Sequence, residues 1–190
     1  MALDKKTFRT RAITAIVFAA VMLIGLFSVS CFAQAPGIQW QKSFGGSGED
    51  FAKAIVQTSD GGYVFGGDTN SSDGDVVGYP WSYSVTRRDY WIVKTDAEGN
   101  IAWQKVYGGF YNDLLTSINS TSDGGYIVSG YSESSDGTVL GHIGNYDYWL
   151  LKLNALGEIE WQKTLGGTNE DYATGIIQTT DGGYITIGHT

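Results

Sequence analysis

Carboxylates are the most abundant side chains in this sequence that could do chemistry. A pair drawn from its 20 Asp and Glu residues could serve as acid and base in a glycosidase. The acidic residues that recur do so once in each repeat of the chain: Asp50, Asp113 and Asp171 form one set, and Asp89 and Asp147 form another. A catalytic residue is expected once in the protein, whereas a residue that holds a turn is expected in every repeat. We therefore predict that these carboxylates accept hydrogen bonds from backbone N–H groups in turns or between repeats.

The sequence supplies few parts for nucleophilic catalysis. Its single cysteine is Cys31, and its two histidines, His142 and His189, occupy non-equivalent positions of different repeats. No G-x-S-x-G, H-E-x-x-H or Walker motif is present. We predict that His142 is a solvated loop residue and that the protein is not an enzyme.

One loop gathers oxygen ligands that suit a hard cation. Its candidate ligands are Asp68, Asn70, Asp73 and Asp75. Carboxylate and amide oxygens are the ligands that Ca²⁺ prefers. The second repeat has other residues at these places, namely Tyr131, Glu133, Asp136 and Thr138. The sequence therefore does not favour a calcium ion in every repeat. It offers one candidate Ca²⁺ site, in the first repeat, and predicts no other cofactor.

A second candidate site lies in a loop that breaks the repeat. The stretch Tyr79-Pro80-Trp81-Ser82-Tyr83 belongs to an enlargement of the first repeat, and Arg87 and Arg88 follow it. Its three aromatic rings could stack on sugars or anchor a protein, and the arginines could bind an acidic group. Binding residues often lie on loops that a rigid frame holds. The alternative is that Trp81 packs over a sheet edge while the arginines neutralise nearby Asp residues.

Composition and charge narrow the class of protein. With 27 Gly in 190 residues, 14% aromatic and 17% charged residues, the chain is neither disordered nor a coiled coil. Its formal net charge of -8 makes nucleic acid and anionic membranes poor partners. Abundant glycine with many aromatic residues indicates short strands joined by tight turns.

The N-terminus has the order of a secretory signal. Four basic residues precede an uncharged stretch over 12–33, which ends in small residues. We expect residues 1–33 to be a helical signal peptide, cleaved after Ala33, so that residues 34–190 are secreted or displayed at the cell surface. Lipidation at Cys31 and an uncleaved anchor are the alternatives, because the stretch could span a bilayer at about 20 residues per crossing. Contact with a membrane is expected through this segment alone.

One unit of sequence recurs two and a half times, which is the strongest signal in the chain. The motif Trp40-Gln41-Lys42 recurs at 103–105 and 161–163. Asp60-Gly61-Gly62-Tyr63 recurs at 123–126 and 181–184, and Asp89-Tyr90-Trp91 returns at 147–149. The first two copies are offset by 63 residues and the next two by 58. The first unit reads as four strands, at about 51–58, 63–69, 90–95 and 101–106, and Asp60-Gly61 is a strong hairpin signal.

Four antiparallel strands per unit, with no helix between them, predict an all-β, β-propeller-like array of four-stranded blades. We assign a lone closing strand to 38–46, blade 1 to 50–109, blade 2 to 113–167 and half of blade 3 to 171–190. The array is thus incomplete, at about two and a half blades. A sandwich or a solenoid with repeated hairpins is the alternative. Further blades or self-association would be needed to cover the open edges and faces of such an array.

The repeated motifs resemble those of a known group of proteins. The pattern W-Q-K, G-G, T-x-D-G-G-Y, S-S-D-G-D, D-Y-W and K-x-D, from Ile38 to Thr190, is similar to the β-propeller repeats exported by Bacteroidetes-type bacteria and some archaea. This resemblance implies a surface or secreted protein rather than a particular chemistry. Thr58-x-Asp60-x-Gly62-x-x-Phe65 also resembles the Asp-box turn of sialidase-like propellers, which staples a hairpin and is not an active site.

These observations together predict a non-enzymatic, secreted or cell-surface β-propeller module that serves binding or scaffolding. Its partner would be a glycan or a protein at the cell surface. Two alternatives stay open: a carbohydrate-active propeller enzyme or carbohydrate-binding module, and a truncated fragment without independent function.

Overall fold

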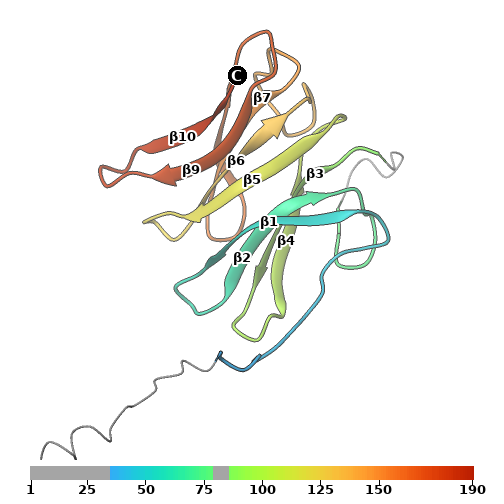
Figure 1. Ribbon diagram of the computed structural model, residues 1–190, viewed down its shortest axis with the longest axis vertical. Helices are drawn as coiled ribbons and strands as arrows, with labels where there is room; N and C mark the ends of the chain where they lie inside the picture. Colours follow the sequence, from blue (N-terminus) through green and yellow to red (C-terminus); the bar gives the residue numbers. More distant parts are fainter. Residues whose placement is uncertain (1–34, 79–85) are drawn as a thin grey trace, which may run out of the picture. The chain divides into compact units, whose positions relative to one another are not determined.

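The computed structural model describes residues 35–78 and 86–190 (Figure 1). All regular secondary structure in these residues is β-strand, and they include no helix long and apolar enough to cross a membrane. The all-β prediction is confirmed for this part of the chain. The predicted signal segment, 1–33, and the aromatic loop residues Tyr79, Trp81 and Tyr83 lie outside the described residues.

Three antiparallel sheets follow one another along the chain. The first contains β1 (Asp50–Gln57), β2 (Tyr63–Thr69), β3 (Asp89–Thr95) and β4 (Ile101–Tyr107). The second contains β5 (Asp113–Ser120), β6 (Tyr126–Ser132), β7 (Asp147–Leu153) and β8 (Ile159–Leu165). The third contains β9 (Tyr172–Gln178) and β10 (Tyr184–His189). Within each sheet, every strand pairs with the next one in sequence, as expected when antiparallel strands follow one another directly.

The hairpin between the first two strands of each sheet has the same local cause. Gly61, Gly124 and Gly182 have φ angles of 83°, 83° and 88°, a left-handed conformation that glycine adopts without steric penalty. In the first hairpin the Asp60 carboxylate accepts a hydrogen bond from the Gly62 N–H at 3.0 Å. The predicted Asp-Gly turns are therefore confirmed.

The first two sheets bury their largest apolar cluster between them. The first sheet contributes Val64, Tyr90 and Ile92 to it, and the second contributes Leu115 and Ile118 among others. Strand β5 lies against β1, β2 and β3, and β9 lies against β5, β6 and β7, so each sheet packs on the one before it (Figure 1). Complete burial of one such side chain stabilises the fold by about 1.5–3 kcal/mol, so this stacking is the main source of stability.

A tryptophan fastens consecutive repeats at one end of the sheets. The Trp103 indole N–H, on β4, donates to the Ala155 carbonyl at 3.1 Å, in the turn between β7 and β8. The turn residue Gly157 has a φ of 74°, and a Cβ there would lie 2.9 Å from the Trp103 ring. Glycine is thus required both by the backbone and by the approach of the ring.

The segment predicted as a lone closing strand, 38–46, pairs with no strand in the described structure. Its Trp40 nevertheless repeats the contact made by Trp103. The Trp40 indole N–H donates to the Ala97 carbonyl at 2.9 Å, and the ring packs edge-on against Tyr63. Trp40 therefore occupies, against the first sheet, the place that Trp103 occupies against the second.

Trp103→Phe tests this fastening contact. We expect it to lower the free energy of unfolding by about 1 kcal/mol, the usual net contribution of one hydrogen bond, because the Ala155 carbonyl loses its indole donor. The matched control is Trp161→Phe. Trp161 packs edge-on against Tyr184, and within the described chain no strand pair follows β10 to offer a corresponding carbonyl. Urea denaturation of both variants measures the difference, and equal losses would contradict the assignment.

Candidate functional site

The carboxylates that recur at the start of the first strand of each sheet bind the backbone before that strand. Asp50 accepts from the Gly46 N–H at 2.8 Å, Asp113 from the Gly109 N–H at 2.7 Å and Asp171 from the Gly167 N–H at 2.6 Å. Three equivalent residues thus make one equivalent contact. The prediction that these residues hold turns is confirmed.

The second recurring set places two carboxyl groups together inside the protein. Asp89, at the start of β3, is 1% exposed, and Asp113 is fully buried. Both carboxyl groups lie over Gly108, and a Cβ built there would lie 2.6 Å from Asp89 Oδ1 and 2.7 Å from Asp113 Oδ2. Neither oxygen of Asp89 meets an N–H or O–H donor among the described residues. Because no substrate could reach groups buried this deeply, the pair is unsuited to glycoside hydrolysis.

Burial governs the protonation of this pair. It raises the pKa of Asp89 to about 9, with the neighbouring Asp113 as the second cause. Burial also raises the pKa of Asp113 to about 6, although hydrogen bonds from Ser132, Gly109 and Ser134 oppose that rise. Two adjacent carboxylates without water cannot both stay ionised. Burial therefore favours a proton on this pair at neutral pH.

The corresponding pair in the next repeat, Asp147 and Asp171, has a backbone N–H donor and a histidine beside it. A Cβ at Gly166 would contact both Asp147 Oδ1 and Asp171 Oδ2, so these carboxyl groups are neighbours too. Asp147 accepts from the Ile143 N–H at 2.6 Å and lies 3.0 Å from Nδ1 of His142. The His142 side chain is only 11% exposed, so the prediction of a solvated loop histidine is wrong. The sequence did not indicate that its loop folds back onto Asp147.

The Asp-box residues form hairpin staples that also anchor a lysine. The hydroxyl of Thr58 donates to the Asp60 carboxylate, and Nζ of Lys94 donates to it at 2.8 Å. These bonds, the one from Lys94 first, hold the pKa of Asp60 below its usual range. In the second repeat, Nζ of Lys152 lies 2.9 Å from the Asp123 carboxylate. The Asp-box side chains are thus engaged in structure, as predicted for a staple.

Three of the four predicted calcium ligands accept hydrogen bonds from different backbone N–H groups of residues 45–49. Asn70 accepts from the Glu49 N–H at 2.6 Å, Asp73 from the Ser47 N–H at 2.7 Å and Asp75 from the Gly45 N–H at 3.1 Å. The fourth, Asp68, faces an arginine. Across residues 35–78 and 86–190, no three His, Cys, Asp or Glu side chains form a group that could hold a metal ion. A single Ca²⁺ in this loop stays a prediction.

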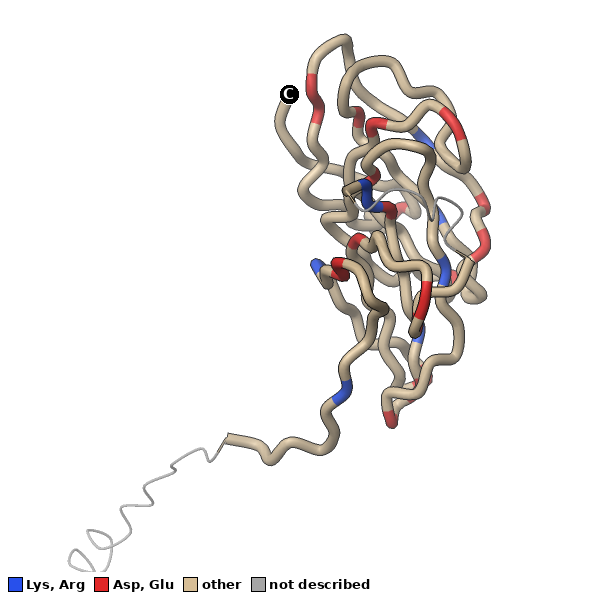
Figure 2. Tube along the Cα trace, turned by 90° about the vertical axis from the view of Figure 1, so that its right-hand side faces the viewer, with Lys and Arg blue, Asp and Glu red and all other residues tan. Residues whose placement is uncertain are grey.

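Both candidate ligand-binding arginines make contacts within the protein. Arg88 donates to the buried Asp68 carboxylate at 3.2 Å, and its guanidinium lies 4.7 Å from the Phe51 ring centre. The guanidinium of Arg87 lies 4.0 Å from the ring centre of Phe110. The Arg88–Asp68 ion pair matches the alternative in which the arginines neutralise nearby Asp residues, whereas Arg87 contacts a ring. Figure 2 shows that Asp and Glu are spread along the trace, with few Lys and Arg between them.

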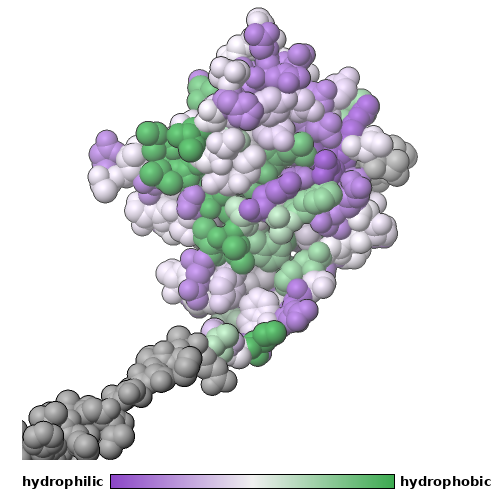
Figure 3. All heavy atoms as spheres, in the orientation of Figure 1, coloured by the Kyte–Doolittle hydropathy of each residue, from purple (hydrophilic) through white to green (hydrophobic). Residues whose placement is uncertain are grey.

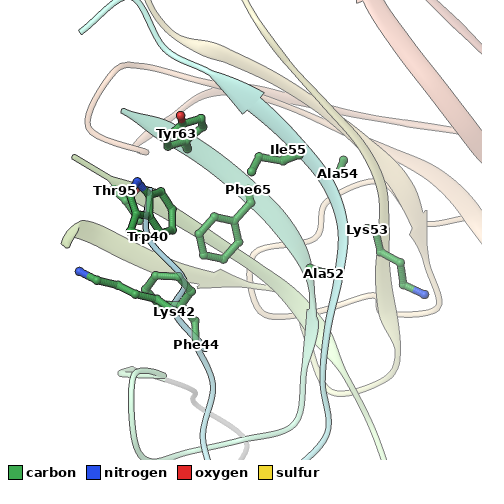
Figure 4. Close-up of a pocket in the computed structure, with 10 residues that line it drawn as sticks. All are labelled: Trp40, Lys42, Phe44, Ala52, Lys53, Ala54, Ile55, Tyr63, Phe65 and Thr95. Carbon is green, nitrogen blue, oxygen red and sulfur yellow. The ribbon is translucent and has the colours of Figure 1, made fainter. Parts of the chain in front are cut away.

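An open apolar hollow of about 450 Å³ lies on the exposed face of the first sheet. Figure 4 shows the rings of Trp40, Tyr63 and Phe65 together in it, with Ile55 pointing toward Phe65. Phe44 packs against Phe65, with ring centres 5.1 Å apart. Aromatic rings of this kind suit sugar faces or apolar side chains. Sequence reasoning missed this hollow, although the position of the Trp40 motif before the first complete repeat was its signal.

No protein-family model matches the chain, and no curated protein matches it either. The internal repeat is therefore the basis for interpreting each surface, because equivalent residues can be compared between copies.

The pH dependence of stability tests the buried carboxyl pair. Because the pKa of Asp89 in the folded protein exceeds its usual value of 3.8, its stabilising contribution is complete below pH 3.8 and is lost as pH rises through about 9. Asp89→Asn keeps the shape and removes the ionisation. We expect this variant to be more stable than the parent at pH 8 and its stability to depend less on pH between 6 and 9, as measured by thermal melts.

Asp73→Asn is the control for this experiment. Asp73 is exposed, and its pKa is lowered, first of all by the hydrogen bond from the Ser47 backbone. Asn can still accept that bond, so this variant should keep the alkaline loss of stability. Equal pH profiles for Asp89→Asn and the parent would show that Asp89 is ionised in the folded protein.

Proposed function

We propose that the chain is a secreted or cell-surface β-propeller segment that acts as a non-enzymatic binding or scaffold module. The observation that carries the proposal is the recurrence of one junction: Trp40 binds the β3–β4 turn of the first sheet, and Trp103, on β4, binds the equivalent β7–β8 turn of the second sheet through equivalent atoms. Sheets joined by one repeated contact are expected to follow one another by a repeated rotation, as blades do. The order of charged, apolar and small residues before residue 34 supports export.

The structural contacts of the recurring carboxylates support a non-enzymatic function. The recurring acids Asp50, Asp113 and Asp171 bind backbone N–H groups, and Asp89 is out of reach of solvent. The Asp-box carboxylates of Asp60 and Asp123 are bonded to lysines. The carboxyl groups of Asp50, Asp113, Asp171, Asp60 and Asp123 are therefore engaged in contacts that hold the fold.

Two surfaces are candidates for the ligand. One is the aromatic loop with Tyr79, Trp81 and Tyr83, beside Arg87 and Arg88. The other is the hollow lined by Trp40, Tyr63 and Phe65. Both contain aromatic residues, and the rings of the hollow, which pack on the first sheet, lose little entropy on binding. A cell-surface glycan or an apolar protein segment fits either surface.

A glycan array combined with a hydrolysis assay tests the proposal. We expect the full chain to retain particular glycans without releasing reducing sugar, because the buried Asp89–Asp113 pair is out of reach of a glycan and the Asp-box carboxylates are bonded to lysines. Trp81→Ala with Tyr83→Ala should abolish retention if the loop is the site, and Tyr63→Ala should do so if the hollow is. Unchanged melting of the variant would separate lost binding from lost packing.

Turnover of any bound glycan would contradict the proposal and favour the carbohydrate-active enzyme. Leu156→Glu serves as the control variant, because Leu156 lies in the exposed β7–β8 turn, where the first repeat itself carries Glu98. It should leave both retention and melting unchanged.

A further inference from the structure

One side of the first sheet is apolar and exposed, whereas the equivalent side of the second sheet is buried against the first sheet. We call this the N-terminal face and define it by Ala52, Ile55, Tyr63 and Phe65. Ile55 is 64% exposed, whereas its equivalent Ile118, 63 residues later, is 2% exposed because the first sheet covers it. The same surface is therefore buried in one copy of the repeat and open in the other.

The third sheet exposes the other side of the repeat, the side that in the first sheet packs against the second sheet. We call it the C-terminal face and define it by Ile177, Ile185 and Ile187, which are 54%, 52% and 65% exposed. Ile177 and Ile185 are register partners across β9 and β10, so their side chains share one side of the sheet. Ile127, the equivalent of Ile185, is fully buried. Figure 3 shows apolar surface over β9 and β10.

The junction between the first two sheets shows how the two faces fit. Val56 and Val64 are the equivalents of Ile177 and Ile185, and they belong to the cluster that contains Leu115 and Ile118. Leu115 and Ile118 are in turn the equivalents of Ala52 and Ile55. At the first junction, residues equivalent to those of the C-terminal face therefore pack against residues equivalent to those of the N-terminal face.

The strands that make this fit are present at both ends. In the first junction, β5 lies against β1, β2 and β3 of the preceding sheet. Strands β9 and β10 are the equivalents of β1 and β2, so they supply two of these three strands. Trp40 already fills the place of the preceding tryptophan on the Ala97 turn. A sheet that packs on the N-terminal face would therefore find the tryptophan–turn contact of this junction already formed by Trp40.

We infer that two copies of this chain associate head to tail, with the C-terminal face of one copy seated on the N-terminal face of the other. Ile185 of the first copy lies against Ile55 of the second, as Val64 lies in the cluster with Ile118. Such an interface is heterologous, so it closes into a ring or continues as an open chain of copies. The aromatic hollow is filled by protein in this assembly.

The inference rests on the proposed succession of blade-like sheets, but its measurement is independent of any glycan. Sedimentation velocity of the full chain, from nanomolar to high micromolar concentration, should show association that increases with concentration. Ile55→Glu and Ile185→Glu each place a carboxylate in one face. Each variant alone should associate at least about thirtyfold more weakly, the loss typical of a central interface anchor.

Mixing the two variants gives the decisive arm. Ile55→Glu keeps an intact C-terminal face and Ile185→Glu keeps an intact N-terminal face, so the mixture should form dimers and nothing larger. Recovery of dimers also shows that both variants are folded. Leu156→Glu is the matched control, since Leu156 is 64% exposed like Ile55 but lies on neither face, and it should associate as the parent does.

Three results would overturn the inference: a parent chain that stays monomeric throughout, association that neither face variant weakens, or a mixture that stays monomeric. A monomeric chain that still retains glycans without turnover would refute the self-association alone. Glycan turnover by an associating chain would refute the proposed function alone.

Discussion

The face-to-face burial of successive sheets is the interaction on which the rest of this structure depends. Each four-stranded sheet carries apolar residues on both sides, and strand pairing alone leaves those sides in water. In the first junction, Val64 and Ile92 on one sheet meet Leu115 and Ile118 on the next, and all four are buried. Apolar area removed from water stabilises by roughly 25 cal/mol per Å², so the stacking of sheets outweighs any single polar contact. The hydrogen bonds of the turns decide where the sheets sit.

The polar groups at the junction follow from this stacking. Sheets that pack this closely bring the start of β3 beside the start of β5, which places the Asp89 and Asp113 carboxyl groups over Gly108. A side chain at residue 108 would collide with them, so glycine is required there by proximity rather than by backbone angle. Burial raises the pKa of Asp89, and the neighbouring Asp113 carboxyl group adds to the rise.

Strand positions could be predicted from the sequence because their causes are local. Asp-Gly turns and alternating apolar residues predicted 63–69 and 101–106, and β2 and β4 match them within one residue. The structural role of Asp50 followed from its recurrence. The environment of His142 and the Asp89–Asp113 pair could not be predicted, because each joins segments whose meeting depends on loop path and sheet packing. The hollow beside Ile55 was missed for another reason: its residues have the apolar character of core residues, although Ile55 is exposed and its equivalent Ile118 is buried.

Equivalent residues of the repeat are buried where a described sheet precedes them and open where no described sheet does, as Ile118 and Ile55 show. Thiol labelling measures this directly in a Cys31→Ser background, which removes the chain's single cysteine. Ile55→Cys and Ile118→Cys place one thiol at each of two equivalent positions. At nanomolar concentration, the account predicts rapid labelling at position 55 and protection at position 118 until the protein unfolds. Equal labelling rates at the two positions would contradict it.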